Sequence, residues 1–270
     1  MNADYRQTAA WLKDRLPAQP VAGLILGTGL NDLADSLEQL ARFPYSEIPG
    51  FVRSTAPSHR GVLILALLGG KPVLILQGRF HFYEGHGMEQ VVFPTRVLAC
   101  LGIKTLLVTN ASGSLRQELG PGSLVQITDH INFMGRNPLV GENDESLGER
   151  FPSMNQLYDP GYLDRCAAIA SEEGILLHHG VYVSVSGPSL ETRAECAAFA
   201  MWGADLVGMS TVPEVIAARH AGMKVAAFSI VTNYSNLFHD EAHSQEEIRD
   251  NAAKAGAGLT RVLSRLTAEL

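Results

Sequence analysis

The sequence is poor in charge and in aromatic residues, and it has no long apolar run. Charged residues make up 18% of its 270 positions and aromatic residues 7%, and the formal net charge is −7. A chain with this acidic balance is not expected to bind nucleic acid or an anionic membrane surface. Its apolar runs also fall well short of the ~20 residues that a membrane-spanning helix needs. We therefore expect neither nucleic acid nor membrane as a partner.

Cysteine is scarce as well. Cys100, Cys166 and Cys196 are far apart, odd in number and without a CxxC pair. This pattern fits a reducing compartment and gives no sign of a zinc site. The first sixteen residues, MNADYRQTAAWLKDRL, carry charge throughout, so we expect no signal peptide. The sequence predicts a cytoplasmic protein without a bound metal.

What the sequence does contain is a large apolar fraction, 46%, arranged in short blocks. Runs rich in Val, Ile and Leu predict strands that are covered on both faces, and patterns typical of helices lie between them. The predicted strands are 21–26, 62–68, 72–76, 105–109, 123–128, 181–186 and 224–231. The predicted helices are 4–16, 88–101, 161–173, 191–201, 213–221 and 244–266.

Strands and helices alternate over the whole length, which predicts one α/β domain, residues 1–270, built as a three-layer sandwich. Pro94 interrupts the second helix, so that helix should begin late or be kinked. Residues 132–160 show little pattern. A loop of that length inside a compact domain is usually functional or covers a neighbouring subunit.

The most unusual polar stretch is QGRFHFYEGHG, Gln77–Gly87, directly after a predicted strand. If the chain is extended there, Arg79, His81 and Tyr83 share one face. The planar fork of an arginine suits phosphate oxygens, and a histidine adds a donor. An exposed edge with salt bridges remains an equal alternative. A metal site is weaker, because His81 and His86 lack the spacing of a zinc motif.

Three further segments place small or hydroxyl residues at strand ends. They are LGTGLND (26–32), VTNASGSL (108–115) and GMSTVPE (208–214). Backbone amides in such turns, with a helix N-terminus behind them, bind anions. Each segment alone is equally well an ordinary turn or helix cap. Together with 77–87 they predict an anion site at the carboxyl ends of the strands, where α/β sheets bind ligands.

Two polar residues stand apart from these loops. Glu191, in GPSLETRAE (187–195), lies at a strand-to-helix turn, and Asn233, in SIVTNYS (229–235), ends a buried strand. A carboxylate is favoured at a helix start, and an asparagine amide both donates and accepts hydrogen bonds. On their own they are also common helix-start and turn residues.

Taken together, these motifs resemble those of the trimeric purine nucleoside phosphorylases, which act on 6-oxopurine nucleosides. The most specific matches are GRFHFYEG, GPSLETRAE and GMSTVPEVIAARH, and the resemblance runs from about Leu24 to the last helix. It implies a central mixed β-sheet and a homotrimer. It also implies reversible phosphorolysis in purine salvage, with nucleoside and phosphate as the small-molecule partners and no cofactor besides phosphate as co-substrate.

The resemblance also implies roles for single residues, with Asn233, His81 and Glu191 as the catalytic ones. Glu191 would accept the purine N1–H, and Asn233 would hydrogen-bond N7 and the 6-oxo group of the leaving base. The implied phosphate ligands are Thr28, His59, Arg79, His81, the Ala111 backbone amide and Ser210. The implied nucleoside contacts are Tyr83, Tyr182, Leu190, Glu191, Met209, Asn233, either His243 or Gln245 at the 5′ end, and Phe151 of a neighbouring subunit.

Some positions depart from the family pattern. Leu190 stands where an aromatic residue usually packs on the base, and Gln245 stands where a histidine meets the 5′-hydroxyl. Two other functions therefore stay open. A methylthioadenosine phosphorylase of the same superfamily would place aspartates where this chain has Asn233. A non-catalytic nucleoside-binding protein would not need Arg79, His81 and Asn233 together.

Overall fold

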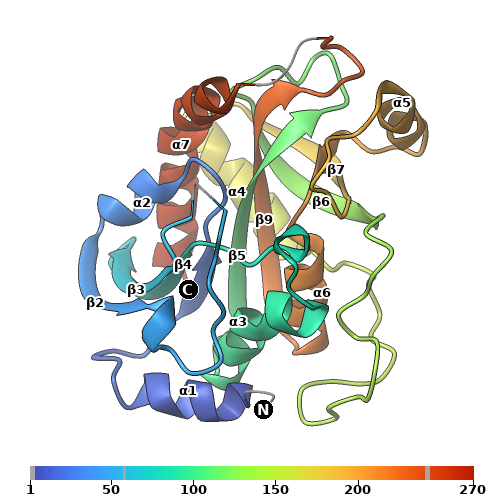
Figure 1. The fold of residues 1–270 in the computed structure, drawn as a ribbon. Helices are drawn as coiled ribbons and strands as arrows, with labels where there is room; N and C mark the ends of the chain where they lie inside the picture. Colours follow the sequence, from blue (N-terminus) through green and yellow to red (C-terminus); the bar gives the residue numbers. More distant parts are fainter. Residues whose placement is uncertain (1–3, 57–58, 241–243) are drawn as a thin grey trace.

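The computed structural model describes residues 4–56, 59–240 and 244–270. In this part of the chain a nine-stranded sheet lies between helices (Figure 1). The strands are β1 (Ala22–Ile25), β2 (Glu38–Pro44), β3 (Val62–Leu68), β4 (Lys71–Gln77), β5 (Thr105–Ser114), β6 (Leu124–Asn132), β7 (Leu177–Ser184), β8 (Leu206–Gly208) and β9 (Lys224–Tyr234). The helices are α1 (Tyr5–Lys13), α2 (Asn31–Asp35), α3 (Met88–Cys100), α4 (Pro160–Glu172), α5 (Arg193–Met201), α6 (Val212–His220) and α7 (Gln245–Ala268), with short 3-10 turns η1 (Tyr45–Glu47) and η2 (Phe82–Glu84).

The sheet is mixed, as expected. Its strand order is β2-β3-β4-β1-β5-β8-β7-β6-β9, and β9 also pairs with β5. β1 runs parallel to β4 and β5, whereas β2, β3 and β4 are mutually antiparallel neighbours. The β5–β9 pairing closes β5, β8, β7, β6 and β9 into a ring, from which β1, β4, β3 and β2 extend as an open sheet.

Alternate residues of the central strands enter two separate cores. In β3, Leu63 and Leu65 pack into a cluster with α1, α3 and α6, and Ile64 packs into a second cluster with α2, α4 and α7. Successive side chains of a strand point to opposite faces, so both faces of the sheet are covered. The three-layer α/β sandwich is therefore confirmed. A third, smaller cluster joins α5 to the ends of β7 and β8.

Some predicted boundaries were wrong. α3 begins at Met88 and runs through Pro94, so the proline does not delay the helix. The small residues after 109 do not form a turn, because β5 continues to Ser114 and pairs with β9 as far as Tyr234. No strand is predicted from the sequence at β2 or β8, whereas α2 begins at Asn31, in the segment 26–32 that the sequence places ahead of a helix.

The long segment between β6 and α4 has no regular element, as expected. At its end, Tyr158 forms an isolated bridge with Val225, and Asp159 N donates to the Val225 carbonyl over 2.9 Å. No helix in the described residues combines the length and the apolar character needed to cross a bilayer.

Candidate active site

Arg79 is the buried cation of the site. It follows β4 by two residues, and its side chain is 3% exposed. Nε donates to Glu214 Oε1 over 2.6 Å, and one terminal nitrogen donates to the Thr109 carbonyl over 3.1 Å. The other terminal nitrogen donates to Ser210 Oγ over 3.2 Å. A buried guanidinium is tolerated because each of its three nitrogens has a partner.

His81 lies two residues further on and is also buried. Its Nδ1 and its backbone amide both lie 2.9 Å from Glu84 Oε1. Its ring stacks on Tyr83 with centroids 4.6 Å apart, and the His59 ring lies 5.1 Å away. Tyr83 belongs to η2, so the extended chain predicted for 79–83 is wrong, although His81 and Tyr83 still meet.

Burial controls the protonation of these groups. Burial, and then the nearby His81 and Arg79 charges, lowers the pKa of His59 to about 3. Burial also lowers the pKa of His81, against the opposing hydrogen bond to Glu84. Burial favours the neutral carboxyl at Glu84, but hydrogen bonds from His81 and Thr55 outweigh it and hold its pKa below the usual range. Near neutral pH the site therefore combines neutral imidazoles with a charged Arg79.

Ser210 stands at the start of α6, as predicted. Its hydroxyl lies 3.2 Å from Thr211 Oγ1, and its backbone amide donates to the Tyr182 hydroxyl over 3.3 Å. Tyr182 is fully buried in β7, and burial raises its pKa to about 12. Thr211 has φ +71° and ψ −53°, and Val212 N donates to Ser210 O over 2.7 Å. This is a γ-turn, a strained conformation for a non-glycine residue.

The turn after β1 lies against β5. The Gly27 amide donates to Thr109 Oγ1 over 2.9 Å, and a Cβ at Gly27 would lie 2.5 Å from the Asn110 Cα. Only glycine permits this approach. Thr28 is therefore carried beside the strand that contains Ala111, and Ala111 itself is in β5, in register with Ile230 of β9.

Glu191 and Asn233 lie at the end of the sheet near α5. Asn236 Nδ2 donates to the Glu191 carbonyl over 2.6 Å, which links the two loops. Burial, with the nearby Glu195 charge, raises the pKa of Glu191. The Asn233 amide accepts from Thr232 Oγ1 and donates to the Tyr234 carbonyl, each over 2.9 Å.

The remaining candidates are more scattered. Met209 packs against Gly187, where an added Cβ would lie 2.4 Å from its sulfur. Leu190 is 55% exposed and Phe151 is 85% exposed. His243 lies outside the described residues, and Gln245 begins α7 with its side chain outside the described part.

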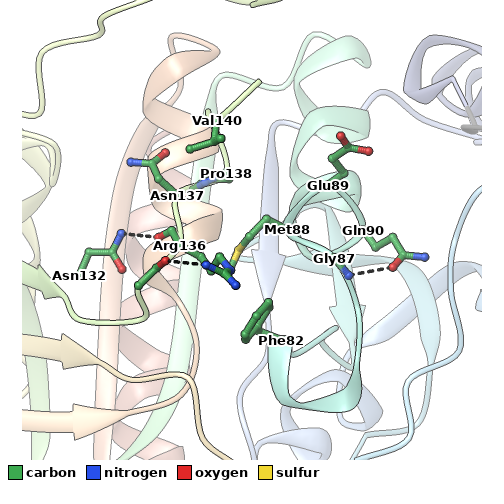
Figure 2. A pocket seen from close by; sticks show the side chains of 11 residues that line it. Phe82, Gly87, Met88, Glu89, Gln90, Asn132, Arg136, Asn137, Pro138 and Val140 are labelled. Carbon is green, nitrogen blue, oxygen red and sulfur yellow. Dashed lines mark hydrogen bonds between the residues drawn. The ribbon is translucent and has the colours of Figure 1, made fainter. Parts of the chain in front are cut away.

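Beside the site a groove of about 820 Å³ separates the start of α3 from the long loop (Figure 2). Phe82, Met88, Pro138 and Val140 line it with apolar surface, and Glu89 and Arg136 add charge at its walls. Val140 is 79% exposed. Phe82, which lines the groove, belongs to η2 together with Tyr83.

Sequence reasoning missed the partners that hold the candidate ligands. Glu214 and Thr109 fix Arg79, and Glu84 fixes His81. A capping-box pattern at 211–214, Thr-Val-Pro-Glu, was the available signal for Glu214. The described residues contain no cluster of His, Cys, Asp or Glu arranged to hold a metal ion.

Comparison with known proteins agrees with this geometry. The family described as the phosphorylase superfamily matches residues 21–268. Purine nucleoside phosphorylase 1 of Bacillus subtilis (strain 168) is 45% identical over 269 residues, covering 100% of this chain and 99% of the relative. Structures of Schistosoma mansoni purine nucleoside phosphorylase with inosine and with adenosine each superpose with TM-score 0.92 at 38% identity, covering 98% of this chain and 96% of theirs. The chain belongs to the phosphorylase superfamily and, within it, to the purine nucleoside phosphorylases, which are pentosyltransferases.

Proposed function

We propose that the chain catalyses reversible phosphorolysis of inosine and guanosine, and of their deoxy forms, in cytoplasmic purine salvage. The bond from C1′ of the sugar to N9 of the purine breaks, and its electron pair leaves with the base. A phosphate oxygen forms the new bond to C1′, which gives a sugar 1-phosphate. The observation that carries the proposal is the cluster of Arg79, His81 and Ser210 at the strand ends, in which Arg79 and His81 are buried.

The phosphate would be held by a buried cation and by neutral donors. Arg79 supplies the charge, Ser210 and Thr28 supply hydroxyls, and His81 and His59 supply imidazoles that burial keeps uncharged. Ala111 would add its backbone amide. Donors fixed in a water-poor site stabilise developing charge more strongly than mobile water does.

The base would be held by Glu191 and Asn233. A 6-oxopurine carries a proton on N1, which a carboxylate accepts, whereas adenine presents a lone pair there. Asn233 would donate to N7 as negative charge grows on the leaving purine. The adenosine complex of the Schistosoma mansoni enzyme shows that this fold admits a 6-aminopurine, so base preference needs a direct test.

The ribose would lie between these groups. Tyr83 would hydrogen-bond a sugar hydroxyl, and Met209 would pack under the ring, with Tyr182 behind Ser210. His243 or Gln245 would meet the 5′-hydroxyl. We assign inorganic phosphate as co-substrate and no further cofactor.

We also propose a homotrimer in which Phe151 completes the neighbour's site. Phe151 is 85% exposed, with the Arg150 guanidinium 5.6 Å from its ring centroid. Phe151 belongs to the long loop, and Arg136, Pro138 and Val140 of the same loop form one wall of the groove. An exposed aromatic side chain and an open apolar groove formed by the same loop favour an interface between copies.

The first experiment measures base release from inosine, guanosine, adenosine and methylthioadenosine, each with and without phosphate. Phosphate-dependent release from inosine and guanosine alone supports the roles of Glu191 and Asn233. Release from methylthioadenosine would contradict the base argument and favour the related phosphorylase. No release from inosine or guanosine with phosphate present would contradict catalysis.

A further inference from the structure

The start of α6 carries a capping pattern that does not cap the helix. Thr211 is the N-cap residue and Glu214 the third helical residue, the positions at which a threonine and a glutamate normally hydrogen-bond each other's backbone amides. Neither side chain makes that bond in the described structure. The Thr211 hydroxyl accepts from Asn110 Nδ2 over 2.8 Å, and Glu214 Oε1 accepts from Arg79 Nε over 2.6 Å. Both side chains are used by the site instead of the helix.

Glu214 is an unusual group to find there. Its side chain is 3% exposed, and its second oxygen, Oε2, is buried without a hydrogen-bond partner among the described residues. Burying a carboxylate is costly unless a charge compensates it, and here the compensation is Arg79. An acidic group beside a phosphate site would by charge alone oppose anion binding, so its position needs another reason.

That reason is the orientation of the guanidinium. An arginine side chain has five N–H groups in a rigid plane. Glu214, the Thr109 carbonyl and Ser210 Oγ take three of them. The other two meet no acceptor in the described part of the chain. A strong bond at Nε fixes the plane of the guanidinium, and with it the positions of the two remaining N–H groups.

We infer that Glu214 is a positioning residue that fixes the Arg79 guanidinium for phosphate. The inference rests on the proposed phosphate site. It predicts that Glu214 acts on phosphate through Arg79, because Arg79 is the one side-chain hydrogen-bond partner of Glu214 among the described residues.

The test is calorimetric titration of inorganic phosphate into the full-length protein without nucleoside, for wild type and Glu214→Gln. The amide keeps the shape but removes the charge, and we expect the phosphate dissociation constant to rise roughly tenfold to a hundredfold, the range of a charge-assisted hydrogen bond. The KM for inosine should stay within about twofold of wild type, since uniform loss of structure would change both. An unchanged phosphate constant in Glu214→Gln overturns the inference.

A double-mutant cycle tests whether Glu214 acts on phosphate binding through Arg79. Glu214→Gln should have almost no further effect in an Arg79→Met background, because the group through which it acts is gone. An equal effect in both backgrounds overturns the positioning role. If Arg79→Met itself binds phosphate like wild type, the proposed phosphate site is wrong. If it weakens phosphate binding and Glu214→Gln does not, only the role of Glu214 is wrong.

Removing one member of a buried pair can lower the folded fraction. Glu214→Asp keeps the carboxylate but shortens the side chain by one methylene, which moves the charge away from Arg79. Circular dichroism shows which variants are folded. In that variant we expect a smaller rise in the phosphate dissociation constant with inosine KM unchanged. A wild-type constant in Glu214→Asp contradicts the inference.

Discussion

At the scale of single residues, the protonation of His59 makes the stability of the protein depend on pH. Its folded-state pKa is about 3, whereas a histidine in an unfolded chain titrates near 6.5. The unfolded chain therefore binds a proton first as the pH falls. The contribution of His59 to the free energy of unfolding is fully present above about pH 6.5 and is lost progressively toward pH 3.

We therefore expect His59→Asn to flatten the loss of stability between pH 7 and pH 5. Urea unfolding at both pH values gives the two free energies for wild type and variant. His179, which is exposed on β7, provides the matched control, and His179→Asn should keep the wild-type slope. If His59→Asn loses as much unfolding free energy between pH 7 and pH 5 as wild type does, His59 is not the cause of that loss.

Asn233 is the residue on which turnover should depend most. Asn233→Ala removes the donor proposed for purine N7, and loss of one such donor costs about 10² to 10³ in turnover. Phosphate binding should be unaffected, because the Asn233 side chain hydrogen-bonds Thr232 and Tyr234 rather than the Arg79 cluster. Steady-state rates on inosine and phosphate calorimetry check the two halves of this prediction. Full activity in the variant would exclude Asn233 from the mechanism.

At the scale of elements, the turn after β1 depends on a backbone contact. Gly27→Ala would place a Cβ 2.5 Å from the Asn110 Cα of β5, and neither backbone can easily move. We expect a loss of about 1 to 3 kcal/mol in the free energy of unfolding, the usual cost of overpacking. Phosphate binding should weaken too, because Thr28 follows directly.

Gly256 in α7 is the matched control for that change. The nearest atom to an added Cβ there is Leu30 Cδ2 at 3.9 Å. Gly256→Ala should be neutral or stabilising by about 0.5 to 1 kcal/mol, because alanine favours helix. Equal losses in both variants, measured by urea unfolding, would contradict the role given to the β1 turn.

The elements that the sequence predicted best are the buried ones. β3 and β4 are near-continuous apolar runs, and both were located to within one residue at each end. β2 was missed because it lies at the sheet edge with mostly exposed side chains, so it carries no apolar run. β5 was predicted too short, since its last residues are small and polar but still pair with β9.

Only the site residues that belong to local sequence motifs could be predicted. Local motifs indicated Arg79, His81 and Ser210, but Glu214 lies 135 positions from Arg79 along the chain, and only the folded sheet brings them together. The η2 turn at Tyr83 was not predicted, although Glu84 contacts His81 at local capping-box spacing; Thr55, distant in the sequence, holds Glu84 as well.

At the scale of the whole molecule, the proposed trimer makes each site depend on two chains. Phe151→Ala should raise the KM for inosine roughly tenfold or more, as expected for loss of an aromatic anchor at an interface. Met201 is a matched control, because it is 87% exposed and Phe151 85%, and Met201→Ala should leave the KM unchanged.

Mixed assemblies test whether Phe151 serves a neighbour. Co-expressed Phe151→Ala and Asn233→Ala chains would form some sites with an intact Asn233 and an intact Phe151 from different subunits. Activity above that of either variant alone supports the shared site, and light scattering gives the number of chains. No recovery in a confirmed mixed assembly would place Phe151 outside the active site.

The pairing of β5 with β9 affects how far the protein can aggregate through the edges of its sheet. An open sheet exposes two edge strands, and each can recruit a strand from another molecule and start aggregation. Here β9, at one end of the strand order, pairs back with β5. Among the described strands β2 alone is therefore left as an edge. β2 carries Glu38, Arg42 and Pro44, the charged and proline residues that discourage such pairing. Protection against intermolecular strand addition therefore rests on seven residues.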